Sequence, residues 1–326
     1  MPRNQKWTVV TGGAGFIGSH LAEYLALQGR RLRLVDDLST GCRGNIEHLM
    51  GPDCELHPLR IGDALAAEPG LFDDVDEVYH LAATVGVQCV VQDPVTAIGN
   101  NVGQTDAVLA AAARSGVRVL LTSSSEVYGR AAAKPLGEDD ELHYGPTTSP
   151  RWSYALGKAI NEHQALAWRA RCGLEVVIVR LFNTIGPRQS GRYGMVVPRF
   201  VQWALRGEPL VVHGDGRQRR AFCDVRDVVR ACVALMAEPA CHGRVFNVGS
   251  DRSVSIAELA RLVIDLSGSQ SPIELLPHER AYGPGFEDPR DRVPDLGRIR
   301  EAIGFAPAWH LEKTLSQLIE QEAVVG

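Results

Sequence analysis

The chain has 326 residues, of which 45% are hydrophobic and 22% are charged, and its formal net charge at pH 7 is −5. This composition is typical of a soluble globular protein with one large or two modest domains; it gives no long-range attraction to nucleic acid, and no apolar run is long enough to cross a bilayer. Seven scattered cysteines without C-x-x-C spacing, ten histidines without a ligand cluster and the lack of an apolar signal segment predict a cytoplasmic protein with reduced thiols and no metal.

The first predicted elements are a strand and a helix joined by a glycine-rich turn. Residues 11–18 read TGGAGFIG, between the apolar run 7–10 and the helical pattern 19–27. Glycines in such a turn allow a tight bend and a close approach of the backbone to a pyrophosphate, which the N–H groups at the start of the helix then bind. We therefore predict a dinucleotide site that includes Gly12, Gly15, Phe16, Ile17 and Gly18.

The second predicted strand, residues 32–36, ends in the acidic pair Asp36 and Asp37. A carboxylate about 20 residues after the glycine turn accepts hydrogen bonds from the adenosine ribose and repels a 2′-phosphate. The pair therefore predicts NAD rather than NADP. The alternative is an ordinary strand–helix–strand unit with a glycine turn.

Strands and helices continue to alternate through the first 180 residues. Further strands are predicted at 55–59, 77–81, 118–122 and 176–180, and the clearest helices at 94–115 and 154–172. This alternation predicts an α/β fold with a Rossmann-type, doubly wound parallel sheet, which binds ligands beyond the carboxyl ends of its strands.

After residue 180 the alternation breaks up. Glycine, proline and arginine are dense in 183–194 and 279–294, and helices are predicted near 196–206, 227–237, 255–267 and 312–320. We predict an NAD-binding domain made of residues 1–180 with about 218–248. Residues 181–217 with about 249–326 are predicted to form a smaller C-terminal lobe that binds substrate.

Two groups of polar residues predict catalysis. Tyr154 and Lys158 are separated by one helical turn, and an ammonium near a phenol favours the phenolate that would remove a hydroxyl proton. Ser124 and Ser125, followed by Glu126, lie at the carboxyl end of the strand 118–122, where they can reach a substrate. The alternatives are a core tyrosine with a solvated lysine, and serines that cap a turn.

Together these motifs resemble the extended short-chain dehydrogenases/reductases that act on nucleotide sugars. The matching segments cover nearly the whole chain: TGGAGFIGSHL (11–21), DDLSTG (36–41), HLAA (80–83), Asn101, SSSEVYG (123–129), Tyr154-x-x-x-Lys158, LFNTIGPR (181–188) and QRRAF (218–222).

The resemblance implies NAD as cofactor, a nucleotide-diphosphate sugar as substrate, and a homodimer built with helices 94–115 and 154–172. It implies that Asp63 contacts the adenine and that Lys158 contacts the nicotinamide ribose, with Leu81, Ala82, Ala83 and Asn101 also at the cofactor. It makes Ser124, Tyr154 and Lys158 the catalytic triad. The residues implied around the nucleotide diphosphate are Asn183, Arg199, His213 and Arg220, and arginine suits this task because its planar fork meets phosphate oxygens bidentately.

Members of this family first oxidise the sugar at carbon 4. An acid such as Glu126 stands at this position in the 4,6-dehydratases and UDP-glucuronate decarboxylases, whereas 4-epimerases usually have small or hydroxyl residues. The segment 282–295, with Arg292, resembles UDP-glucuronate decarboxylases and UDP-apiose/xylose synthases, in which the matching arginine is implicated in decarboxylation. One departure is Val90, where these decarboxylases have a tyrosine. A polar sugar contact is then missing, or it is supplied by Thr84 or Gln88.

The sequence therefore leaves several reactions open. The preferred interpretation is a UDP-glucuronate decarboxylase-like enzyme that forms UDP-xylose or a UDP-4-keto-pentose. The alternative is a UDP-sugar 4-epimerase, and a 4,6-dehydratase or a non-catalytic NAD-binding sensor ranks below both. Tyr193 lies in a loop and could also reach the substrate.

Overall fold

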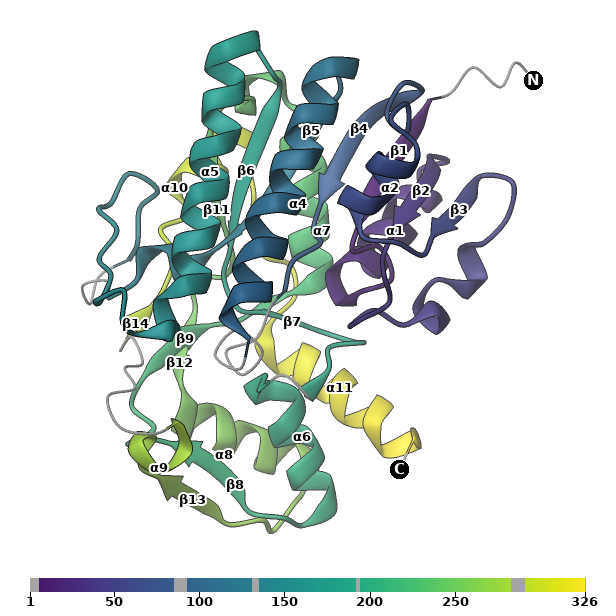
Figure 1. Ribbon diagram of the computed structural model, residues 1–326. Coiled ribbons are helices and arrows are strands. Elements are labelled where there is room, and N and C mark those ends of the chain that lie inside the picture. The colour runs from purple at the N-terminus through teal and green to yellow at the C-terminus, as the bar shows by residue number, and fades with distance from the viewer. Residues whose placement is uncertain (1–5, 85–92, 131–134, 192–193, 283–290, 326) are drawn as a thin grey trace.

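The computed structural model describes residues 6–84, 93–130, 135–191, 194–282 and 291–325. It has a large α/β domain and a smaller lobe that lies beneath it in Figure 1. Across these residues, no helix combines the length and apolar character needed to span a membrane.

In the described part of the chain, seven parallel strands form the central sheet of the large domain, in the order β11-β6-β5-β4-β1-β2-β3. Their bounds are β1 (Trp7–Thr11), β2 (Arg31–Val35), β3 (Cys54–His57), β4 (Val75–His80), β5 (Arg118–Ser124), β6 (Val176–Leu181) and β11 (Val245–Val248). Strand order reverses between β1 and β4, which confirms the predicted doubly wound fold and marks the edge where such sheets bind ligands.

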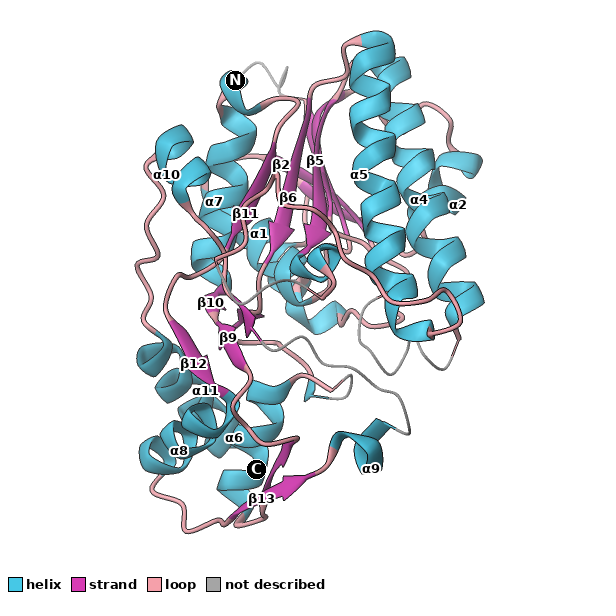
Figure 2. Ribbon diagram, turned by 90° about the vertical axis from the view of Figure 1, so that its left-hand side faces the viewer, coloured by secondary structure: helices cyan, strands magenta, loops and turns pink. Residues whose placement is uncertain are grey.

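Helices cover both faces of this sheet (Figure 2). One face carries α1 (Phe16–Leu27), α7 (Val225–Ala237) and α10 (Gly297–Ile303), and the other carries α2 (Ile61–Ala67), α4 (Pro94–Ser115) and α5 (Ser153–Cys172). Leu21 and Val228 share the first apolar core, and Ala64 and Val108 share the second. Because both faces are covered, β1, β5 and β6 are buried along almost their whole length rather than at alternate residues.

Two late segments also belong to the large domain. Strand β11 pairs with β6, which agrees with the expected return of residues near 218–248 to the sheet. Helix α10 was expected in the lobe, but Ile299 and the nearby Phe305 pack in the core beside the sheet. The sequence conceals this placement because a helix of seven residues is too short to display a clear apolar period.

The lobe packs three helices around its own apolar core. Phe200, Leu259 and Leu315 are buried there, one from each helix. The helices are α6 (Val196–Arg206), α8 (Ile256–Ser267) and α11 (Leu311–Val325), and α9 (His278–Tyr282) lies at the rim. Short strands complete the lobe and its junction with the domain: β7 (Thr184–Ile185), β8 (Leu210–His213), β9 (Arg219–Ala221), β10 (Cys223–Asp224), β12 (Ser253–Ser255), β13 (Ile273–Leu276) and β14 (Asp291–Arg292).

Candidate active site

A cavity of about 1110 Å³ lies between the domain and the lobe, at the carboxyl edge of the sheet. Its wall combines residues from the ends of β1, β2, β4 and β5 with residues of α5, α6, β8, β9 and β14. A space of this size at the switch point of a doubly wound sheet suits a dinucleotide together with a second ligand.

The glycine turn forms one end of the cavity. Gly12 has φ +70°, and a side chain on Gly18 would bring its Cβ within 2.0 Å of the Gly12 carbonyl oxygen. Both positions therefore require glycine, which brings α1 close to β1. Gly15 is the N-cap of α1 and supplies no side-chain cap, so the first N–H groups of the helix remain available to a phosphate.

The acidic pair after β2 lines the same end. Asp36 is buried and accepts hydrogen bonds from the backbone N–H groups of Ala14 (2.9 Å) and Leu38 (2.8 Å). Burial raises the pKa of Asp36, and these bonds oppose the rise. Asp37 Oδ1 accepts two hydrogen bonds from Ser39, one from its backbone N–H (3.0 Å) and one from its hydroxyl (2.5 Å). The two carboxylates thus have different surroundings.

The adenine contact expected of Asp63 stays a prediction. Asp63 is exposed in the first turn of α2, next to the lining residues Leu59, Arg60 and Ile61 but not itself in the cavity wall.

The HLAA segment is fixed from behind by a buried histidine. His80 lies between the hydroxyls of Thr11 (2.8 Å) and Thr105 (3.1 Å), and burial, aided by the charge of Lys158, lowers its pKa to about 3. This histidine is therefore neutral at physiological pH. Leu81, Ala82 and Ala83 then line the cavity, and Asn101 holds Thr84 through two hydrogen bonds, from Thr84 N (2.7 Å) and to Thr84 O (3.1 Å).

Tyr154 and Lys158 point into the cavity from α5, beside Ser124. Lys158 Nζ donates to the carbonyl oxygen of Thr122 (2.8 Å), and burial lowers the pKa of Lys158 to about 8. Burial also raises the pKa of Tyr154; the Glu126 carboxylate adds to this rise, and a hydrogen bond with Ser124 opposes it. Burial and the neighbouring carboxylate thus favour the neutral phenol, and the acidification expected from Lys158 stays a prediction.

Glu126 joins the two parts of the molecule. Its Oε2 accepts a hydrogen bond from Arg151 (2.7 Å), and its Oε1 contacts Arg292 of β14 in the lobe. Burial works against ionisation, but the charges of Arg292 and Arg151 lower the pKa of Glu126 to about 2. Two guanidinium groups thus meet at one carboxylate in the cavity. Ser125, the residue before Glu126, is buried and also lines the cavity.

A buried ion pair behind this group was missed in the sequence. Glu162 lies one turn after Lys158 in α5 and binds Arg180 of β6 through both oxygens (3.0 and 2.7 Å). Ser123 Oγ donates to the same carboxylate (2.5 Å). The pair ties α5 to β6, and the Ser123 bond ties α5 to the end of β5. The i, i+4 spacing from Lys158 was the available signal.

The lobe side of the cavity contains the residues expected around the substrate. Asn183 donates to the carbonyl oxygen of Ala221 (3.1 Å), and the Arg199 guanidinium lies 4.6 Å from the centre of the Trp203 ring. The lining also includes Thr84, His213, Arg220 and Arg292. Gln88, Val90, Tyr193 and residues 283–288 lie outside the described residues. Lining residues that the sequence did not single out are Ser39, Thr40, Leu59, Arg60, Ile61, Asn100, Gln104, Gln189, Gln218, His278 and Arg280.

The chain is similar to known proteins both in sequence and in structure. Residues 8–249 match the family model of the NAD dependent epimerase/dehydratase family. A UDP-N-acetyl-alpha-D-glucosaminuronate decarboxylase of Bacillus cytotoxicus is 39% identical over 317 residues, which cover 97% of each chain. UDP-glucuronic acid decarboxylase 1 of Xenopus tropicalis is 37% identical over 97% of this chain and 72% of the relative.

Solved structures with the same fold include 4-epimerases. A UDP-glucose 4-epimerase of Thermotoga maritima, solved with UDP-glucose, has a TM-score of 0.87 at 28% identity and covers 98% of this chain and 99% of its own. A UDP-N-acetylglucosamine 4-epimerase of Methanobrevibacter ruminantium has a TM-score of 0.88 at 29% identity, with 99% of both chains covered. The fold is therefore shared by proteins named for different reactions.

Proposed function

This chain belongs to the NAD-dependent epimerase/dehydratase family, and we propose that it decarboxylates a UDP-linked uronate, a sugar with a carboxylate on carbon 5. The relatives at 36–39% identity that are named decarboxylases support this choice. UDP-glucuronate and its 2-acetamido analogue are the two substrates to compare, because those relatives are named for one or the other.

The observation that carries the proposal is the arrangement of Arg151 and Arg292 around Glu126. A guanidinium matches a carboxylate in shape and charge, so Arg292 can exchange Glu126 for the sugar carboxylate while Arg151 keeps Glu126 in place. Both arginines line the same cavity as Tyr154. An enzyme whose substrate carries no carboxylate would have less need of two cations at this point.

The cradle fits NAD. Gly12 and Gly18 allow the tight turn that brings α1 close to β1, Gly15 leaves the first N–H groups of α1 available to a phosphate, and Asp36 offers a carboxylate to ribose hydroxyls. When bound, NAD accepts a hydride from carbon 4 of the sugar and can return it. The residues proposed to hold it are Gly12, Gly15, Phe16, Ile17, Gly18, Asp36, Asp37, Leu81, Ala82, Ala83, Asn101, Tyr154 and Lys158.

The chain's own groups would handle the proton and the charge. Tyr154, oriented by Ser124 and with the Lys158 ammonium nearby, takes the proton of the carbon-4 hydroxyl as that carbon is oxidised to a ketone. The ketone makes the sugar a β-keto acid, so the bond from carbon 5 to the carboxylate breaks, CO₂ leaves, and the electron pair moves to the carbon-4 oxygen as an enolate. Arg292 stabilises this negative charge, and protonation at carbon 5 completes the step.

A 4-epimerase is the second candidate, and it is favoured by the structural similarity to two 4-epimerases. In that reaction the carbon skeleton stays intact, and the ketone is reduced on its other face. The two reactions differ in product mass, because only decarboxylation removes CO₂.

The test is to incubate the purified protein with UDP-glucuronate and with UDP-N-acetylglucosaminuronate and to measure the masses of the products by mass spectrometry. A product lighter by one CO₂ supports the proposal. A new sugar of unchanged mass would establish epimerisation, and loss of water would establish dehydration. If no UDP-sugar is converted, the protein would be a non-catalytic NAD-binding protein. Arg292→Ala is expected to reduce CO₂ release far more than NAD binding, and Arg300→Ala, whose side chain pairs with Asp251 outside the cavity, is the matched control.

We also propose a cytoplasmic homodimer. The described cysteines are all unpaired, and Cys54, Cys223, Cys232 and Cys241 are buried thiols, which suits a reducing compartment. Apolar side chains are exposed on the outer face of α4 and α5, namely Val95, Ile98, Ile160 and Leu166, and a second copy of the chain would cover them.

A further inference from the structure

Arg60 lies at the adenosine end of the cavity, close to the acidic pair. The carboxyl ends of β1, β2 and β3 are neighbours in the sheet, and the phosphate-binding turn follows β1. A dinucleotide seated on that turn must therefore place its adenosine over the loops after β2 and β3. Asp37 follows β2, Arg60 follows β3, and both line the cavity.

The two side chains are paired. Arg60 Nε lies 3.1 Å from Asp37 Oδ2, and Arg60 NH1 donates to Asn100 Oδ1 of α4 (3.2 Å). The backbone after Arg60 is fixed as well, because Gly62 N donates to Gln104 Oε1 (2.6 Å). Burial opposes ionisation of Asp37, but its bonds to Ser39 and Arg60 lower its pKa, so the pair is charged at neutral pH.

Acid and arginine have opposite effects on the two nicotinamide cofactors. A carboxylate beside the adenosine ribose accepts hydrogen bonds from its hydroxyls, whereas an arginine there binds a 2′-phosphate. This pocket holds both residue types. Asp36 accepts hydrogen bonds from the backbone of the neighbouring turns. Asp37 instead pairs with the Arg60 guanidinium, the group that would bind a 2′-phosphate.

We propose that Asp37 enforces selectivity for NAD by occupying Arg60, so that the chain carries a 2′-phosphate site that is masked by an ion pair. Arg60 is therefore a specificity residue, because its guanidinium can bind a 2′-phosphate only when it no longer pairs with Asp37. The proposal depends on the cofactor site alone and not on the identity of the sugar substrate.

The test measures the affinities of ligand-free protein for NADH and NADPH by fluorescence titration. Asp37→Asn keeps an oxygen for the Ser39 N–H but removes the charge that holds Arg60. We expect the NADPH dissociation constant of this variant to fall at least about tenfold relative to that of NADH, because a charged hydrogen-bonded contact is gained. The double variant Asp37→Asn/Arg60→Ala is expected to lose this gain.

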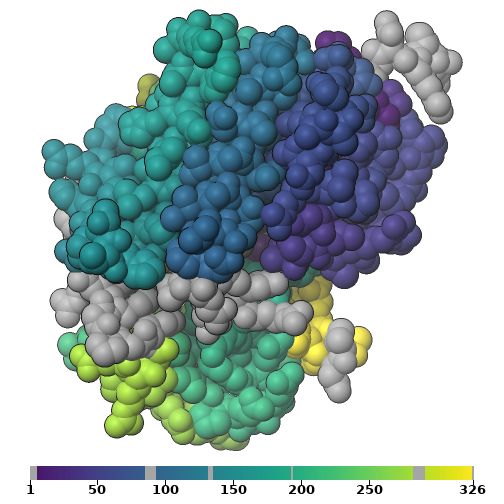
Figure 3. Space-filling view, in the orientation of Figure 1, coloured from purple at the N-terminus to yellow at the C-terminus, as the bar shows by residue number. Residues whose placement is uncertain are grey.

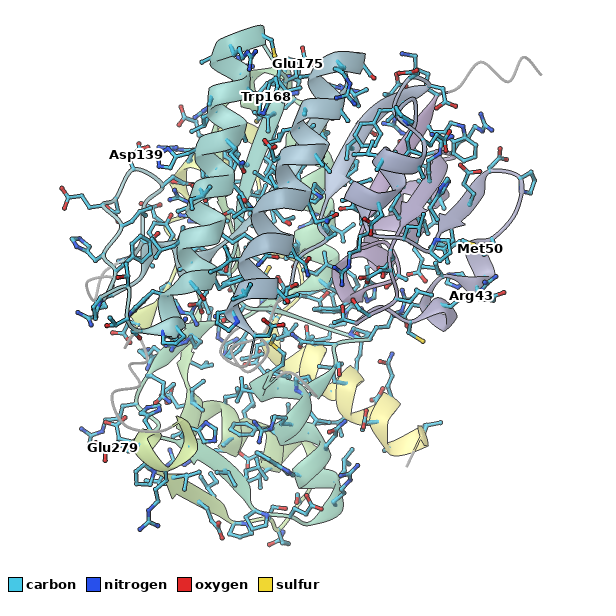
Figure 4. All side chains as sticks on the ribbon, viewed as in Figure 1. Arg43, Met50, Asp139, Trp168, Glu175 and Glu279 are labelled. Atoms are coloured by element: carbon cyan, nitrogen blue, oxygen red, sulfur yellow. The ribbon has the colours of Figure 1, made fainter. Side chains whose placement is uncertain are left out.

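Two control variants separate the effect from a general change in charge. Asp53→Asn breaks a similar exposed pair with Arg31, and Arg43→Ala removes an arginine that pairs with Glu47 and points outward from the large domain in Figure 4. Neither residue lines the cavity, so both variants should bind NADH and NADPH as the parent does.

Three outcomes would overturn the proposal. NADPH affinity could stay unchanged in both Asp37→Asn and a second variant, Asp37→Ser, while NADH still binds. NADPH affinity could rise but stay high in the double variant, so that Arg60 has no part in it. NADH binding could be lost without any gain for NADPH, which would mean that Asp37 acts on the ribose alone and not through Arg60. None of these results bears on whether the enzyme releases CO₂, so the proposed reaction is tested separately.

Discussion

Tyr154 has a raised pKa in the protein without ligands, because burial and the Glu126 carboxylate both disfavour the phenolate. A bound cationic nicotinamide and a charged Lys158 would oppose these effects, so the tyrosine becomes a base only in the assembled site. The raised pKa of Tyr154 is therefore compatible with its proposed role as the base when NAD and the substrate are both bound.

Tyr154→Phe is expected to lower turnover at least about 100-fold, because the proton acceptor is removed while the ring is kept. Retained NAD, measured as cofactor content after purification, should be close to that of the parent. The matched variant is Tyr24→Phe, which removes a hydroxyl from a partly buried tyrosine of α1 outside the cavity and should leave turnover unchanged. Turnover that survives in Tyr154→Phe would remove this residue from its proposed role.

Glu126 makes stability depend on pH in a defined direction. Its pKa is lowered from 4.5 to about 2 in the folded protein, so its contribution is present above the unfolded value and is lost as pH falls through the folded value. Glu126→Gln leaves Arg151 and Arg292 without their anion and is expected to cost about 2–3 kcal/mol at pH 7. Urea unfolding from pH 7 down to pH 3 should show this difference shrinking below about pH 4.5.

The matched variant for that series is Glu47→Gln, which breaks an exposed pair with Arg43. It should change the free energy of unfolding by less than about 0.5 kcal/mol at any pH. A difference between Glu126→Gln and the parent that stays constant from pH 7 to pH 3 would contradict the assigned ionisation of Glu126.

At the scale of elements, helix α8 shows how a short motif determines a boundary. Ser255 Oγ accepts from Glu258 N (3.1 Å), and the Glu258 carboxylate accepts from Ser255 N (2.7 Å), which is a complete capping box. Ser255→Ala is expected to lower the free energy of unfolding by about 1 kcal/mol, because an N–H group at the start of the helix loses its acceptor. Urea unfolding measures this change, and NAD binding should be unaffected because α8 lies in the lobe.

Ser267→Ala is the control at the opposite end of the same helix, where the hydroxyl only donates to Ile264 O (3.2 Å). It should have a smaller effect than Ser255→Ala. Equal losses from the two substitutions would mean that the cap does not determine the stability of α8.

The sequence predicted those elements whose ends carry local signals. Helix α4 begins and ends where the sequence places it, because Asp93 caps its start, Pro94 follows, and Gly116 adopts φ 66° at its end. Strand bounds differ by at most two residues, since neighbouring strands rather than local sequence decide where pairing stops. The alternation of strands and helices predicted the Rossmann-type fold, which the sheet confirms.

The contacts that distinguish this site were not predictable in the same way. Glu126 and Arg292 are 166 positions apart, and Asp37 and Arg60 are 23 apart. No local pattern links such residues, because strand order alone brings them together. A charged residue such as Arg60 in a loop is indistinguishable in sequence from one that faces solvent.

At the scale of the whole molecule, contacts between the domain and the lobe enclose the cavity. Arg292 of β14 reaches Glu126, and the backbone of Leu136 bonds to Val293 (2.8 Å) and Asp295 (2.9 Å). On the opposite side Arg188 bonds to Ser19 (3.0 Å). These contacts attach the lobe to the domain beside the cavity, and they bring Arg292 into the same cavity wall as Tyr154.

The proposed homodimer makes a prediction at this scale. Helices α4 and α5 lie side by side over the face of the large domain that is turned toward the viewer in Figure 3. Ile98 is 43% and Ile160 46% exposed there. In a two-fold symmetric interface each substitution occurs twice, and burying an unpaired charge is costly, so Ile160→Arg should convert the dimer to a monomer. Light scattering after size-exclusion chromatography measures the mass.

Leu27→Arg is the matched variant, because Leu27 is 88% exposed at the end of α1, on the opposite face of the sheet. It should leave the dimer mass unchanged, whereas Ile98→Arg should act as Ile160→Arg does. A parent protein that is monomeric at all concentrations would refute the homodimer, and a dimer that survives both isoleucine substitutions but not Leu27→Arg would place the interface on the α1 side. Activity of the Ile160→Arg monomer would show in addition that each cavity works alone, as expected from a site whose described lining comes from one chain.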